Sequence, residues 1–214
     1  MKTLIKILCL SLLWFSCENS ESNEVCFWDA CYDIETTLEI DLSNSELTGN
    51  IPNEISQLKN LTKLRLENNN LSGQIPFEIY NLTELVNFSI ENNQINDSIP
   101  NQISNLINLV NFNLSNNQMY GKIPSTIESL ENLRYFSLNN NQFSEEIPSE
   151  MKNLSELTLC DLSNNQLSGI ISEEICILNH NGLSFWVQNN KLCPPYPYCL
   201  SDVDIGLQDI SNCP

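Results

Sequence analysis

Residues 61–84 read LTKLRLENNNLSGQIPFEIYNLTE, and this stretch decides the fold because its pattern returns every 24 residues. Three residue types mark the period, each at a fixed place. They are an asparagine (Asn69, Asn93, Asn117, Asn141, Asn165), a proline (Pro52, Pro76, Pro100, Pro124, Pro148) and a leucine (Leu61, Leu85, Leu109, Leu133, Leu157). A fixed period of this length predicts a stack of similar coils, each of which buries its apolar face against its neighbours.

Within one period, with Leu61 as position 1, two kinds of apolar spacing follow each other. Leu64 and Leu66 alternate with polar residues, which predicts a short strand with one buried face. Ile75, Ile79 and Leu82 are spaced by four and three residues, which predicts a helical turn that faces the same core.

The asparagine and glycine residues that recur at fixed positions of the period also have structural roles. The asparagine at position 9 carries donors and an acceptor, so it can satisfy backbone groups where the strand bends away. Glycine at position 13, as in Gly73 and Gly121, suits a turn with positive φ. Asp97 and Glu145 occupy this position in two coils. Because a left-handed backbone costs such residues about 1 kcal/mol or more, we expect a different turn geometry there.

This pattern resembles the leucine-rich repeat family, and specifically its 24-residue plant-extracellular type. The match covers six units over residues 37–180, and a truncated seventh unit follows with Phe185, Val187, Asn190 and Leu192 at the expected places. The resemblance implies an α/β solenoid, curved and right-handed, with a short parallel β-sheet on the concave side and irregular or 3-10 helical segments on the convex side. Residues 18–36 would form an N-terminal cap, and residues 181–214 the partial repeat and a C-terminal cap.

The first 17 residues read MKTLIKILCLSLLWFSC and are typical of a secretory leader, with lysines followed by an apolar run too short to span a bilayer. A cut after Ser16 would place Trp14 where ordinary signal peptidase needs a small residue. The junction before Cys17 instead resembles a loose lipobox, with Trp14 and Phe15 bulkier than usual. We therefore expect a bacterial lipoprotein whose mature chain begins at lipid-modified Cys17, anchored in the cell envelope at the outer membrane or cell surface. The repeat type alone leaves a plant origin open, and the lipobox favours the bacterial one.

Export makes the remaining cysteines candidates for disulfides. The segment Cys26 to Cys31 resembles the N-terminal cap of plant leucine-rich repeat ectodomains, and Cys193 to Cys199 resembles their C-terminal cap. The resemblance implies that each of these two pairs is bonded. Two cysteines are then left as a candidate third pair, Cys176 and Cys213, while Cys160 occupies a core position as a free thiol.

Charge and composition argue against several classes of function. The chain carries 27 acidic and 9 basic residues, a net charge of −18, so it would repel nucleic acid and anionic lipid. It contains one histidine, His180, at a repeat position that favours a structural role, so no base is available for a serine or cysteine nucleophile. No zinc or calcium motif is complete. We expect a protein that is not an enzyme and has no cofactor or metal.

Function is therefore expected on the concave surface, where positions 2, 3, 5, 7 and 8 point away from the core. Positions 7 and 8 are uniformly polar, but the other columns vary. Their exposed apolar, aromatic and basic residues predict a binding face, made of Arg65, Val86, Val110, Arg134, Tyr135, Leu159 and Trp186. The sequence favours a monomeric binding module for a protein, peptide or glycan, and leaves open a structural or adhesive spacer without a specific ligand.

Overall fold

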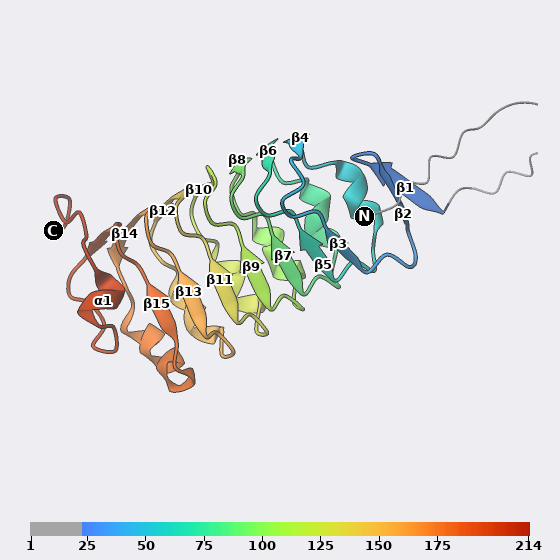
Figure 1. Cartoon of the computed structure of the whole chain (residues 1–214). Helices are drawn as coiled ribbons and strands as arrows, with labels where there is room; N and C mark the ends of the chain where they lie inside the picture. Colours follow the sequence, from blue (N-terminus) through green and yellow to red (C-terminus); the bar gives the residue numbers. More distant parts are fainter. Residues whose placement is uncertain (1–22) are drawn as a thin grey trace, which may run out of the picture.

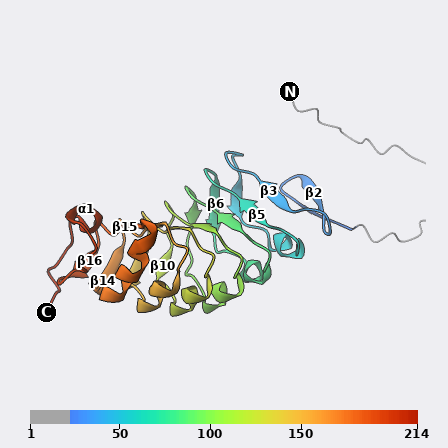
Figure 2. The ribbon, with the colours of Figure 1, turned by 90° about the horizontal axis from the view of Figure 1, so that it is seen from below.

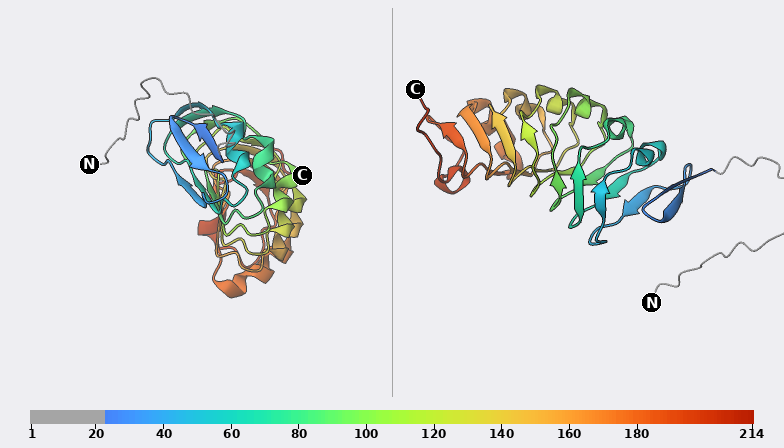
Figure 3. Two further views of the ribbon diagram at one scale, coloured as in Figure 1. Left: turned by 90° about the vertical axis from the view of Figure 1, so that its right-hand side faces the viewer. Right: turned by 90° about the horizontal axis from the view of Figure 1, so that it is seen from above.

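The computed structural model describes residues 23–214, apart from the side chains of residues 179–181. The chain forms the predicted solenoid, in which one coil follows another from the N-terminal to the C-terminal end (Figure 1). Viewed along the stack, the coils lie over one another (Figure 3). The cysteine expected to carry lipid, Cys17, lies outside the described residues, as does the whole leader.

The concave face is a seven-stranded parallel sheet with one strand from each coil. Neighbouring strands pair in register at equivalent repeat positions, so that Phe88 lies opposite Phe112 and Phe112 opposite Phe136. The strands, in spatial order, are β3 (Glu39–Asp41), β5 (Lys63–Arg65), β7 (Asn87–Ser89), β9 (Asn111–Asn113), β11 (Tyr135–Ser137), β13 (Leu159–Asp161) and β15 (Ser184–Trp186).

Two shorter parallel sheets, the edge sheets, are formed by the strands that follow the concave strands in each coil. The first contains β4 (Thr48–Asn50), β6 (Asn70–Gly73) and β8 (Gln94–Ile95). The second contains β10 (Tyr120–Gly121), β12 (Gln142–Glu145), β14 (Gln166–Ile170) and β16 (Lys191–Cys193).

Short 3-10 helices complete each coil and line the side away from the concave strands (Figure 2). Each of the first five follows the repeat proline, whose φ lies between −52° and −78° and which needs no amide donor there. The helices are η1 (Asn53–Gln57), η2 (Phe77–Asn81), η3 (Asn101–Asn105), η4 (Ser125–Ser129), η5 (Ser149–Asn153) and η6 (Glu173–Asn181). Among residues 23–214, no helix is long and apolar enough to cross a membrane.

The core runs unbroken through the stack, because every coil contributes buried residues at the same repeat positions. Its centre includes an aromatic column in which Phe88 stacks on Phe112 and Phe112 on Phe136, with ring centroids 5.8 and 6.0 Å apart. Cys160 continues this column as a fully buried free thiol, as predicted. Burial, followed by the charge of Asp161, raises the pKa of Cys160 well above its ordinary value.

The asparagines at position 9 form the predicted ladder, and Asn117 illustrates the arrangement. Its Nδ2 donates to the carbonyl oxygens of Ile90, Leu114 and Ser115 at 3.0–3.2 Å. Its Oδ1 accepts from the amide of Ile95 in the preceding coil at 2.9 Å. One side chain therefore satisfies backbone groups of two coils at the bend after the strand.

The two coils that lack glycine at position 13 differ from each other. Glu145 adopts a φ of 66°, as the glycines at this position do, so the prediction of a different turn geometry is wrong at this residue. Strand β12 pairs with strands on both sides, and this pairing imposes the conformation of Gly121 and Gly169 on Glu145. Asp97 does not enter the left-handed region, as expected. The edge sheet is interrupted next to it, between β8 and β10.

The N-terminal end is covered by an antiparallel hairpin of β1 (Glu24–Phe27) and β2 (Ala30–Asp33). The predicted disulfide between Cys26 and Cys31 is confirmed and joins the two strands. Val25 and Phe27 of this hairpin are buried against the first coil, so that the hairpin shields the end of the core.

At the C-terminal end, the cysteines predicted to be bonded are bonded, but the predicted pairs Cys193–Cys199 and Cys176–Cys213 are wrong. Cys176 pairs with Cys199 and Cys193 with Cys213, each with Cα atoms 5.6 Å apart. The physical reason is the path of the tail after β16. It forms the short helix α1 (Asp202–Ile205) and then returns beside the last coil, where the amide of Asn189 donates to the carbonyl of Leu207. This return brings Cys213 to Cys193.

Candidate binding surface

The concave sheet presents the side chains that alternate with core residues. In β11, Phe136 is buried, whereas Tyr135 is 48% exposed on the other face of the sheet. The neighbouring strands follow the same alternation, so equivalent positions form columns across the coils. Residues of one column are about 4.8 Å apart, close enough for side chains to act together.

A groove of about 740 Å³ lies beside the beginning of the concave strands. Its floor follows the column at position 2, where Val86, Val110 and Arg134 succeed one another. The amide of Val110 donates to the carbonyl of Val86 at 2.8 Å, and the amide of Arg134 to the carbonyl of Val110 at 2.9 Å. The lining residues are Thr62, Glu84, Val86, Asn108, Val110, Asn132, Arg134 and Glu156.

The wall of this groove is the column at position 24, in which two amides, Asn108 and Asn132, lie between two carboxylates, Glu84 and Glu156. Asn108 and Asn132 donate to carbonyl oxygens of the preceding coil at 2.9 and 3.0 Å. Glu84 and Glu156 cannot donate such bonds, so their carboxylates are available to other partners. Glu156 lies 3.1 Å from Arg134, whereas Glu84 is exposed and forms no ion pair with any described residue.

Two further predicted residues lie beside this groove. Tyr135 follows Arg134 directly and lies in register with Leu159 on the adjacent strand. We call Val86, Val110, Arg134, Tyr135 and Leu159 the central patch. It combines an apolar surface, one exposed aromatic ring and one guanidinium, which are the residue types that dominate binding energy in interfaces.

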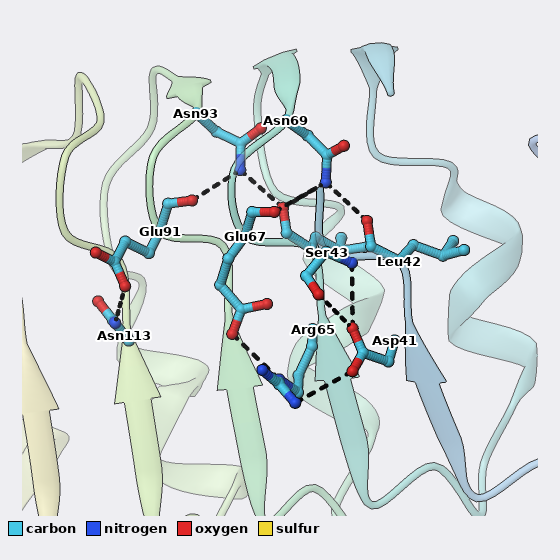
Figure 4. Close-up of polar contacts among 10 residues, drawn as sticks. Asp41, Leu42, Ser43, Arg65, Glu67, Asn69, Glu91, Asn93 and Asn113 are labelled. Atoms are coloured by element: carbon cyan, nitrogen blue, oxygen red, sulfur yellow. Dashed lines mark hydrogen bonds and ion pairs between the residues drawn. The ribbon is translucent and has the colours of Figure 1, made fainter. Parts of the chain in front are cut away.

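Arg65 is separate from the central patch. It lies on β5 at position 5 and is held by Asp41 at 3.1 Å and Glu67 at 3.3 Å (Figure 4). Asp41 in turn accepts from the hydroxyl of Ser43 at 2.6 Å. A guanidinium already held between two carboxylates contributes less to recognition of a new partner.

Trp186 lies at the far end of the sheet, on β15, and its register partner is Asp161 on β13. Its side chain is 37% exposed. Strand β13 separates Trp186 from Tyr135. The structure therefore brings five of the seven predicted residues together and leaves Arg65 and Trp186 at opposite sides of them.

Polar atoms without hydrogen-bond partners lie next to Arg65 on the concave side. They are Oε2 of Glu67, Oδ1 of Asn87 and Oγ of Ser89, all buried. Figure 4 shows Glu67 and Glu91 side by side on this face, with Glu91 accepting from Asn113 at 2.9 Å. Of the three unpartnered groups only Glu67 carries a charge, and its other carboxylate oxygen pairs with Arg65 at 3.3 Å.

The predicted binding face left out five residues that line the groove: Thr62, Glu84, Asn108, Asn132 and Glu156. Of these, Glu84 and Glu156 are the acidic ones. The signal was available, because both replace the asparagine that position 24 has in other coils, such as Asn108 and Asn132. The uniform asparagine at repeat position 8, by contrast, has a structural cause and does not mark a binding residue. It reflects the backbone, since all members of this column have φ between 54° and 57°: Asn44, Asn68, Asn92, Asn116, Asn140, Asn164 and Asn189.

Among the described residues, no group of three or more histidine, cysteine or acidic side chains is placed to hold a metal ion. The side chain of His180, the one histidine of the sequence, lies outside the described part of the structure. The concave surface therefore offers shape, apolar contact and charge for recognition.

Comparison with known proteins agrees with this architecture. The sequence profile of the Leucine Rich Repeat matches residues 37–58, 60–82, 108–130, 132–154 and 156–178, more than half of the chain. The chain belongs to the leucine-rich repeat family. In this leucine-rich repeat protein, the profile leaves residues 83–107 unmatched between two matched repeats. This segment contains Asp97.

Solved structures similar to this leucine-rich repeat protein include plant receptor ectodomains from Arabidopsis thaliana. One is the ectodomain of the receptor kinase GASSHO1/SCHENGEN3 in complex with CASPARIAN STRIP INTEGRITY FACTOR 2, with 34% identity over 75% of this chain and a TM-score of 0.72. Another is the HAESA ectodomain in complex with an IDA peptide hormone ligand, with 38% identity over 70% of this chain and a TM-score of 0.67.

The chain spans 19% of the first of these ectodomains and 25% of the second. A plant ice-binding protein is closer in length, since the chain covers 72% of it, with 26% identity over 80% of this chain and a TM-score of 0.52. None of the curated proteins compared with the chain matches it.

Proposed function

We propose that this protein is an exported, non-catalytic binding module that takes a protein or peptide segment on its concave face. The observation that carries the proposal is a groove lined by three of the predicted residues, Val86, Val110 and Arg134, with Tyr135 next to Arg134 in the chain and Leu159 in register with Tyr135. The similar GASSHO1/SCHENGEN3 and HAESA ectodomains were each solved with a peptide or protein ligand, which supports the same class of partner.

The groove favours an extended segment with an apolar residue next to a basic one. Its floor crosses the strands from Thr62 to Arg134, about 14 Å at the usual strand spacing, which corresponds to about four extended residues. An apolar side chain would cover the two valines, and a basic side chain would approach the unpaired carboxylate of Glu84. The acidic net charge of −18 would accelerate the encounter with such a partner.

We also propose that the module works at a bacterial cell surface, as a monomer held by a lipid on Cys17. The three disulfides support an oxidising compartment, because such bonds rarely persist in the cytosol. The leader and its Ser16–Cys17 junction support the anchor.

A peptide selection tests the binding function. The mature protein would be used to select from a random peptide library, with each selected peptide then measured against variants. We expect peptides that combine apolar and basic residues, with affinity reduced at least tenfold by Tyr135→Ala with Arg134→Ala. Trp186→Ala is the matched control, since it removes an exposed aromatic ring of the same sheet outside the central patch, and should leave affinity unchanged.

The competing function is that of a spacer without a specific ligand. If no peptide is enriched, or if enriched peptides bind the Arg134–Tyr135 double variant as well as the wild type, the central patch is inert. A spacer would then be the better description of the solenoid.

A further inference from the structure

A second groove lies on the edge sheet, away from the concave strands. It has a volume of about 820 Å³ and extends over the first three coils, next to β4, β6 and β8. We call it the lateral groove. It shares no lining residue with the concave groove, and its own lining is Asn50, Ile51, Asn53, Glu54, Gly73, Gln74, Ile75, Pro76, Phe77, Tyr80, Asp97, Ser98 and Pro100.

Three departures from the repeat meet in the lateral groove. Phe77 occupies position 17, where the other coils have Asn53, Asn101, Ser125, Ser149 and Glu173. Tyr80 occupies position 20, where they have Ser56, Ser104, Glu128, Lys152 and Cys176. Asp97 replaces the glycine of position 13 in the following coil. None of the three is needed for the solenoid, because the other coils fold without them.

The two aromatic residues have different environments. They lie three residues apart on the 3-10 helix η2, with ring centroids 6.2 Å apart in an edge-to-face arrangement. Phe77 is 52% exposed, whereas Tyr80 is 1% exposed. The ring of Phe77 therefore offers an apolar surface at the rim, and Tyr80 forms part of the inner lining.

The hydroxyl of Tyr80 is buried and has no hydrogen-bond partner. Burial, followed by the negative charge of Asp97, raises the pKa of Tyr80, so the hydroxyl keeps its proton and remains a donor. A buried hydroxyl without a partner costs free energy, which a ligand oxygen would relieve. Among the described residues this hydroxyl is thus a donor without an acceptor, and it belongs to a residue that lines the lateral groove.

The remaining polar groups of the lateral groove are carboxylates, amides and one hydroxyl. Glu54 is exposed, and Asp97 accepts from the amides of Ile75 and Ser98 at 3.1 and 2.8 Å. No lysine or arginine lines the groove, so an anionic ligand would find no counter-charge. A simple cation would supply no acceptor for Tyr80. A neutral molecule rich in hydroxyl groups needs no counter-charge and supplies an acceptor for Tyr80.

We propose that the lateral groove binds a neutral saccharide unit. Tyr80 donates to a sugar oxygen, and Glu54, Asp97 and the neighbouring amides accept from sugar hydroxyls. The exposed ring of Phe77 packs against the C–H face of the sugar. This site is independent of peptide binding on the concave sheet, so the protein would hold a glycan and a peptide at the same time.

The test measures binding of neutral disaccharides to the mature protein. Maltose, cellobiose, lactose and chitobiose serve as probes, with digalacturonate as the anionic comparison, by saturation-transfer NMR followed by calorimetry. We expect at least one neutral disaccharide to bind, and its affinity to fall about tenfold in Tyr80→Phe and in Phe77→Ala. Tyr120→Phe is the matched control, since Tyr120 is exposed outside the groove, and should bind like the wild type.

The stability of the free Tyr80→Phe variant gives a second readout. Because the wild-type hydroxyl has no partner, its removal should leave the melting temperature unchanged or raise it by about 2 to 4 °C. The proposal is overturned if no neutral disaccharide binds, if digalacturonate binds more tightly, or if Tyr80→Phe and Phe77→Ala bind like the wild type. A lowered melting temperature of Tyr80→Phe would show that the hydroxyl has a partner, and would overturn it too.

Discussion

At the scale of single residues, asparagine has two unrelated roles, one at each of two consecutive positions of the repeat. At position 8 it tolerates a left-handed backbone, as in Asn116 with a φ of 55°. At position 9 it supplies hydrogen bonds, as in Asn117. The sequence alone predicted the second role, because a side chain with donors and an acceptor at a bend has an evident function. It did not predict the first, because uniform polarity at an exposed position looks the same as simple solvation.

Replacing a ladder asparagine should therefore be costly. We expect Asn117→Ala to lower the free energy of unfolding by about 2 to 3 kcal/mol, because backbone groups of two coils lose their partner. Urea denaturation measures the change. Gln118→Ala is the control at the next, exposed position, with an expected change within about 0.5 kcal/mol. Equal stability of the two variants would contradict the role given to the ladder.

The two non-glycine residues at position 13 should respond to glycine with opposite signs. Glu145→Gly relieves the left-handed strain and should raise the free energy of unfolding by about 0.5 kcal/mol. Asp97→Gly removes the carboxylate that accepts from Ile75 and Ser98, and should lower it by about 1 kcal/mol. Chemical denaturation of both variants provides the check, and changes of the same sign would show that the turns do not differ as described.

At the scale of elements, repeat spacing predicted the strands and the 3-10 turns, but not how the caps close. The strands follow from apolar residues such as Leu64 and Leu66, which alternate within one coil. The C-terminal disulfides depend on the return of the tail beside the last coil, which no repeat spacing encodes. The resemblance to plant caps therefore implied the wrong pair at this end, Cys193 with Cys199, although it implied the right one for the Cys26–Cys31 hairpin.

Peptide mapping under non-reducing conditions should recover Cys176–Cys199 and Cys193–Cys213 as separate cross-linked pairs. Loss of one of these bonds, each closing a loop of about 20 residues, should cost about 3 kcal/mol of stability. Cys160 should resist alkylation until the protein unfolds, since burial keeps its thiol protonated. A peptide that joins Cys193 to Cys199 would contradict the path described for the tail.

At the scale of the whole molecule, the solenoid separates two surfaces that differ in chemistry. The concave sheet carries the central patch, with its guanidinium, beside acidic residues, and the lateral groove carries aromatic, amide and acidic groups without any basic residue. The sequence identified most of the concave face because its columns could be aligned by period. It did not indicate the lateral groove, because Asp97 comes to Phe77 and Tyr80 only when its coil stacks on theirs.

The proposed anchor predicts where the protein resides. Metabolic labelling with a palmitate analogue in a bacterial host should label the wild type and leave Cys17→Ala unlabelled and released from membranes. Cys9→Ala, which changes another cysteine of the leader, is the control and should label normally. Labelling of Cys17→Ala, or its retention on membranes, would contradict lipid attachment at this residue.

The central claim is that a peptide occupies the central patch, and side-chain oxidation footprinting with a selected peptide tests it most directly. Bound peptide should reduce oxidation of Tyr135 and Leu159 on the concave sheet. Oxidation of Phe77 on the lateral groove and of exposed Tyr198 near the C-terminus should stay unchanged. Protection of Phe77 or Tyr198 without protection of Tyr135 would contradict the account, because the peptide would then bind outside the concave face.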